Sequence, residues 1–61
     1  MNWEELKEKA LEKGFFVEIF GEFIAVGDVY FWNNGEVNIL GAVIAKDRTP
    51  EQMLMIMRGL E

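Results

Sequence analysis

The sequence predicts a small α+β domain with the order α-β-β-β-α, in which N- and C-terminal helices flank a three-stranded antiparallel meander. Three observations predict this class. Helix-capping patterns stand near both ends of the chain. Residues 15–45 are dense in Phe, Val, Ile, Tyr and Trp and are divided by glycines, which is typical of short strands joined by tight turns. A chain of 61 residues has room for one domain, so residues 1–61 are treated as a single unit.

The first helix is expected over residues 2–13. Asn2 is a suitable N-cap, and Glu5 stands three residues later in the capping-box position. Gly14 follows as a residue that permits a left-handed helix end. One side of the helix is apolar and is formed by Trp3, Leu6, Ala10 and Leu11.

Glycine dipeptides are expected to turn the chain between strands. Gly21-Glu22 can join residues 15–20 to the next strand. Asn34-Gly35 suits a two-residue type I′ hairpin turn, because both of its positions need a positive φ.

The number of strands depends on Gly27-Asp28. A strand over residues 36–45 is long, and a two-residue turn pairs it with residues 24–33. We therefore favour one strand over residues 22–32 that bends at Gly27-Asp28, which gives three strands in all. A true turn at this dipeptide is the alternative, and it gives four strands.

The second helix is expected to begin after Thr49, which is a suitable N-cap, with Pro50 at the first helical position and Gln52 at the third. Its apolar stripe consists of Met53, Ile56, Met57 and Leu60. Leu54 and Met55 fall off that stripe, so the helix is apolar on nearly every side, which indicates contacts on more than one side. Methionine is common at adaptable binding surfaces. An ordinary core with one exposed methionine is the alternative.

Both faces of the expected sheet are apolar, whereas a solvated face alternates to polar residues. One face is expected to carry Phe15, Val17, Ile19, Ile24, Val26, Tyr30, Trp32, Val37, Ile39 and Val43. The other is expected to carry Phe16, Phe20, Phe23, Ala25, Val29, Phe31, Leu40, Ala42 and Ile44. The helices are expected to cover the second face, because small residues at its centre allow close packing. The face with Tyr30 and Trp32 is then left for a partner.

These patterns favour a small non-enzymatic protein-interaction or regulatory module. It would self-associate as a homodimer, or bind another protein, through an apolar sheet face and the Met-rich C-terminal helix. The predicted interaction residues are Tyr30, Trp32, Val37, Ile39, Leu54 and Met55. The chain contains no Cys, His or Ser, so we expect no catalytic residues, no metal site and no cofactor.

The charge of the chain limits its partners. A net charge of −5 disfavours nucleic acids and anionic membranes, and residues 14–45 contain no Lys or Arg. The aromatic residues of the sheet nevertheless make a single-stranded nucleic-acid-binding protein the alternative function. A third hypothesis is a small-ligand or catalytic site at an oligomer interface, in which Glu18 or Asp28 is shared.

The expected location is the cytoplasm. No stretch approaches the roughly 20 apolar residues of a membrane-spanning helix. The charged first ten residues are unlike a secretory signal. The lack of serine and the single glutamine favour a thermophilic source.

Overall fold

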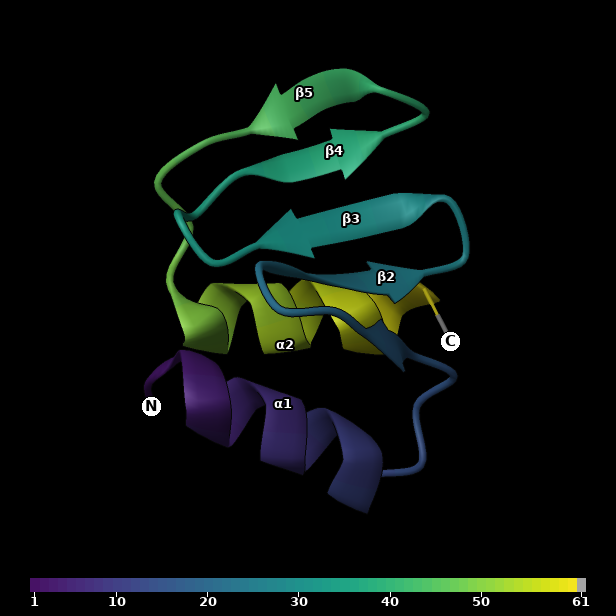
Figure 1. Cartoon of the computed structure of the whole chain (residues 1–61), viewed down its shortest axis with the longest axis vertical. Helices are drawn as coiled ribbons and strands as arrows, with labels where there is room; N and C mark the ends of the chain where they lie inside the picture. Colours follow the sequence, from purple (N-terminus) through teal and green to yellow (C-terminus); the bar gives the residue numbers. More distant parts are fainter. Residues whose placement is uncertain (61) are drawn as a thin grey trace.

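The computed structural model describes residues 1–60 and confirms a small α+β domain with a helix at either end of an antiparallel sheet. Its elements are α1 (Trp3–Glu12), β1 (Glu18–Ile19), β2 (Phe23–Val26), β3 (Val29–Trp32), β4 (Val37–Ile39), β5 (Ala42–Ala45) and α2 (Pro50–Leu60). The strands form one meander in chain order, which has five strands instead of the expected three or four (Figure 1).

Two hairpin turns produce the additional strands. Gly27-Asp28 is a true two-residue turn, so the strand expected over residues 22–32 is divided into β2 and β3. Leu40-Gly41 is another, and it divides the strand expected over residues 36–45 into β4 and β5. Leu40 and Gly41 have φ values of 50° and 84°, as a type I′ turn requires. A leucine rarely adopts such a φ, and for this reason the sequence pattern does not reveal the turn.

The loop between β3 and β4 is one residue longer than expected. The backbone nitrogen of Trp32 donates to the carbonyl oxygen of Glu36 at 2.9 Å, so three residues, not two, form the turn. The side-chain oxygen of Asn34 accepts from the backbone nitrogen of Glu36 at 3.0 Å. This extra residue shifts the register and places Phe31 opposite Val37.

The faces of the sheet therefore differ from the expected ones. The helix-side face carries Ile24, Val26, Val29, Phe31, Val37 and Ile39. The open face carries Phe23, Ala25, Tyr30, Trp32, Asn38 and Val43. Each expected face is a mixture of the two, because the two-residue turn at Gly27-Asp28 places even-numbered residues of β2 opposite odd-numbered residues of β3. Tyr30 and Trp32 do lie on the face that the helices leave uncovered.

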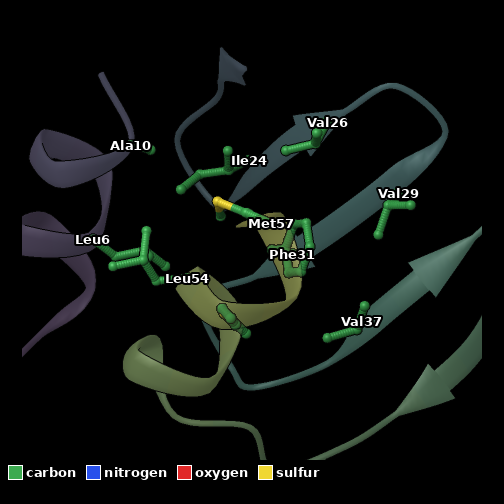
Figure 2. Packing of buried hydrophobic residues seen from close by; sticks show 10 residues of the cluster. Leu6, Ala10, Ile24, Val26, Val29, Phe31, Val37, Leu54 and Met57 are labelled. Carbon is green, nitrogen blue, oxygen red and sulfur yellow. The ribbon is translucent and has the colours of Figure 1, made fainter. Parts of the chain in front are cut away.

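Helix α2 packs between the sheet and α1. Its residues Met53 and Met57 are fully buried against the helix-side face, where Met57 lies beside Phe31 (Figure 2). Leu54, on an adjoining side of α2, meets Leu6 of α1 (Figure 2). Each large apolar side chain buried in this way contributes roughly 1.5–3 kcal/mol of transfer free energy. The core therefore depends on two sides of α2, and the second side contacts α1 within the chain, where the sequence favoured a contact with a partner.

The helix ends match the predicted capping patterns. The side-chain oxygen of Asn2 accepts from the backbone nitrogen of Glu5 at 2.8 Å. Thr49 and Gln52 form a reciprocal capping box, with the hydroxyl of Thr49 accepting from Gln52 at 3.2 Å and the amide oxygen of Gln52 accepting from Thr49 at 2.9 Å. Gly14 follows α1 with a φ of 76°. Both helix starts are thus determined by residues within four positions of one another.

The helices leave one end of the sheet uncovered. Figure 1 shows the strands in succession from β2, which lies next to α2, to β5 at the opposite end of the molecule. Ala42, Val43 and Ile44 of β5 are exposed, while Ile24, Phe31 and Val37 are fully buried. The core thus lies under β2, β3 and β4, and β5 is a surface strand.

Candidate interaction surfaces

An aromatic cluster occupies the open face at the β1–β3 end of the sheet. Phe23 lies at its centre, with ring-centroid distances of 4.5 Å to Phe20, 5.0 Å to Tyr30 and 4.7 Å to Trp32. The register explains this arrangement, since Phe23 pairs with Trp32 and its carbonyl oxygen accepts from the backbone nitrogen of Phe20 at 2.9 Å. Each such aromatic pair adds about 0.5–1.5 kcal/mol beyond the burial of its area. The cluster therefore holds itself in a defined shape on an exposed surface.

The indole of Trp32 is also fixed by a neighbour on β4. With the Asn38 amide oriented so that both of its polar atoms have partners, its oxygen accepts from Trp32 Nε1 at 3.2 Å. Asn38 is paired with Tyr30 on one side and with Val43 on the other. This polar residue thus anchors the edge of the aromatic cluster in the middle of the open face.

A hollow of about 480 Å³ lies beside the aromatic cluster, above Ala25. Ala25 pairs with Glu18 of β1 and with Tyr30 of β3, so a small side chain stands between two larger ones. The walls of the hollow are formed by Phe16, Glu18, Phe20, Phe23 and Tyr30. The hollow results from this order of side-chain sizes across the strands.

The charge around the hollow is negative. Glu18 is the only charged residue that lines it. The segment from Gly14 to Ala45 supplies carboxylates and no Lys or Arg. Among residues 1–60, the ion pairs join the terminal amine of Met1 to Glu51 at 3.6 Å and Lys7 to Glu4 at 3.8 Å, and neither involves the sheet. The described residues also contain no group of three acidic side chains that could hold a metal ion.

Strand β5 forms a second apolar surface at the opposite edge of the sheet. Its only strand partner among the described residues is β4, so its other edge faces solvent. The exposed fractions are 80% for Leu40, 47% for Val43 and 55% for Ile44. The register shifts by one residue between Val37 and Asn38, which leaves Ile44 without a cross-strand partner on β4.

The two sheet edges differ in how they are protected. Edge strands usually avoid unwanted pairing by being short or by carrying charged residues or proline. β1 meets both conditions, because it has two residues and one of them is Glu18. β5 has four residues, Ala42–Ala45, none of which is charged. The register shift beside Ile44 is the single protective feature of β5, and β5 is therefore the edge that is open to pairing.

A groove of about 410 Å³ separates the end of β5 from α2, and it is lined by Ala45, Arg48, Gln52, Met55 and Ile56. Gln52, Met55 and Ile56 share one side of α2, because they are spaced at i, i+3 and i+4. Leu54, which contacts α1, lies on the opposite side of this helix. Met55 is 69% exposed. The groove thus continues the apolar surface of β5 onto the helix.

The predicted interaction residues are divided by the structure. Tyr30 and Trp32 lie in the aromatic cluster, and Met55 lines the groove. Val37, Ile39 and Leu54 instead belong to the core or pack against it, so the prediction that they are surface residues is wrong. The changed register places Val37 and Ile39 on the helix-side face. Leu54 is buried because α1 packs on a second side of α2.

Sequence reasoning missed the residues that make β5 an open edge, which are Leu40, Val43 and Ile44. The signal that could have found them is the run from Val37 to Ala45, which contains no charged residue. Asp28, a shared acid in the third hypothesis, is an exposed turn residue.

Comparisons with known protein families, with curated proteins and with solved structures found no match to this chain. None of the helices within residues 1–60 is long and apolar enough to cross a membrane.

Proposed function

We propose that this chain is a small non-enzymatic protein-interaction module that self-associates as a homodimer through β5. The observation that carries the proposal is the uncharged, exposed edge of β5, bordered by an apolar groove against α2. Exposed apolar surface of this kind on a chain too small to cover it favours a partner.

A second copy of the chain is the partner that fits this edge. Antiparallel pairing of β5 with the same strand of another copy is self-complementary about a two-fold axis, which is the commonest symmetry of oligomers. Pairing of β5 with β1 of another copy would extend without closing, and it would place Glu18 against an apolar strand. The isologous pairing avoids both problems.

Helix α2 lies beside β2, away from this interface, and approaches β5 only at Ala45 (Figure 1). A two-fold axis perpendicular to the sheet keeps both copies of α2 on the same face of the joined sheet, one on each side of the β5 seam. The two helices are then kept apart by the strands that each copy places between α2 and the seam (Figure 1). The proposed interface thus uses the sheet edge in place of the open sheet face and of the Met-rich helix.

Light scattering on a sizing column, over a series of protein concentrations, tests the proposal. The chain is expected to elute at twice its own mass. Replacing Ile44 with lysine introduces a charge on the edge strand and should give a monomer. The matched control is Leu11→Lys, because Leu11 is 59% exposed on α1 and lies outside the interface. A monomeric wild-type chain at high micromolar concentration would contradict the proposal, as would a dimeric Ile44→Lys variant.

The alternative function, binding of single-stranded nucleic acid, is favoured by the stacked rings of the aromatic cluster, on which bases could stack. It lacks the positive charge that phosphate binding needs, since residues 14–45 contain no Lys or Arg. An oligonucleotide titration followed by tryptophan fluorescence distinguishes the two functions. Binding that quenches Trp32 and is lost in salt would support the alternative.

A further inference from the structure

Independently of self-association, we infer that the hollow above Ala25 binds an organic cation that carries a quaternary ammonium group. The hollow has a volume of about 480 Å³, which lies within the range of small-molecule sites. Four aromatic rings and one carboxylate form its walls, and they belong to Phe16, Phe20, Phe23, Tyr30 and Glu18.

The walls match the chemistry of a quaternary ammonium. The faces of aromatic rings carry partial negative charge and attract cations, by about 0.5–1 kcal/mol at an exposed site such as this one, where Phe16 is 91% exposed. A quaternary ammonium has no N–H group, so its methyl groups can lie against rings without leaving a donor unpaired. The polar side chains of the hollow are limited to the carboxylate of Glu18 and the hydroxyl of Tyr30.

Glu18 provides the charge that makes the hollow selective for cations. It pairs with Ala25, so it stands directly beside the floor of the hollow. No ion pair within residues 1–60 involves Glu18, and no Lys or Arg occurs between Gly14 and Ala45 to compete with a bound cation. Because Glu18 is exposed, its contribution should be modest and should fall with ionic strength.

The site does not depend on the proposed dimer. The hollow is formed by one chain, on the open face of β1, β2 and β3, whereas the proposed interface uses β5. A dimer joined through β5 would leave both hollows accessible. Failure of one proposal therefore leaves the other intact.

A titration of the intact chain with choline, followed by backbone amide chemical shifts, tests this site. The controls are the uncharged tert-butyl analogue of choline and sodium chloride at matched ionic strength. Choline should give saturable shifts at residues 16–20, 23–25 and 30. The uncharged analogue should bind about tenfold more weakly, because it fills the same space without the cation–π attraction and without the attraction to Glu18.

Two carboxylate variants complete the test. Glu18→Gln should weaken choline binding about fivefold, which corresponds to the loss of one exposed charge interaction. Glu22→Gln removes a nearby exposed carboxylate that does not line the hollow, and it should bind choline as the wild type does. Both substitutions are at exposed positions outside the core. The proposal is overturned if choline gives no saturable shifts, if the uncharged analogue binds equally well, or if Glu18→Gln binds like the wild type.

Discussion

Gly35 is the residue at which the backbone leaves least room for a side chain. Its φ is +96°, and a Cβ atom added there would lie 3.0 Å from the backbone nitrogen of Arg48 and 3.0 Å from the Cα atom of Asp47. The backbone nitrogen of Arg48 also donates to the carbonyl oxygen of Gly35 at 2.9 Å. This glycine thus packs the β3–β4 loop directly against the segment that leads into α2.

Replacing Gly35 with alanine is expected to lower the free energy of unfolding by about 1–3 kcal/mol, because the new Cβ requires both a strained φ and a shift of neighbouring backbone. The matched control is Gly59→Ala. Gly59 lies in α2 with open space at its Cβ position, so alanine there should raise stability by about 0.5–1 kcal/mol. Urea unfolding measures both changes. Equal effects of the two substitutions would contradict this account of Gly35.

A substitution at Val37 tests the register of the sheet through a single side chain. It is fully buried opposite Phe31, so Val37→Ala should destabilise the fold by roughly 2 kcal/mol. Leu11→Ala, at a 59% exposed position, should change stability by less than about 0.5 kcal/mol. Urea unfolding at a fixed protein concentration compares them. A Val37→Ala variant as stable as Leu11→Ala would indicate that Val37 faces solvent, as the sequence had suggested.

At the scale of the elements, the helices could be predicted and the strands only in part. Each helix start depends on residues three positions apart, Asn2 with Glu5 and Thr49 with Gln52, so short sequence patterns are sufficient. The order and antiparallel character of the meander were also predictable, because glycine turns separate the apolar runs.

The number of strands and their register could not be predicted in the same way. Leu40 adopts a left-handed turn conformation that its residue type disfavours, and only pairing between β4 and β5 shows the turn. The loop after Trp32 has three residues where a two-residue turn was expected. This shift of one position turns each side chain of β4 to the opposite face of the sheet. Three of the six predicted interaction residues therefore lie in the core or against it. Val37 and Ile39 do so because of the changed register, and Leu54 does so because α1 packs on it.

The capping box of α2 gives a prediction for a whole element. Thr49→Ala removes the hydroxyl that accepts from the backbone nitrogen of Gln52, and it should lower stability by about 1 kcal/mol. Thr49→Ser keeps an oxygen at the same position and should remain close to the wild type. Thermal unfolding followed by circular dichroism measures both. A serine variant as unstable as the alanine variant would mean that the methyl group of Thr49, not the cap, stabilises α2.

At the scale of the whole molecule, the two helices cover only part of the sheet. Both helices lie toward the β1–β3 end of the sheet, and β5 extends beyond them (Figure 1). A chain of this length buries only about 60% of the surface that its unfolded form exposes. The uncovered apolar surface is therefore concentrated on the aromatic cluster and on β5, and we propose a ligand for the first and a second copy of the chain for the second.

The net charge of −5 gives opposite salt effects at these two surfaces. Two copies of the chain repel each other, while β5 itself is uncharged, so salt should strengthen the dimer about two- to threefold by screening that repulsion. Choline binding should instead weaken as salt screens Glu18. Sedimentation equilibrium and the amide shift titration, each at low and high sodium chloride, measure the two effects. A dimer that dissociates in salt would mean that ion pairs hold it together.

Intermolecular nuclear Overhauser effects between labelled and unlabelled chains give the sharpest test of whether two copies join through β5. Pairing through β5 predicts contacts across the seam between backbone protons of Ala42–Ala45 in the two copies. Intermolecular contacts confined to Phe23, Tyr30 and Trp32 would place the interface on the open face instead, and would contradict this pairing.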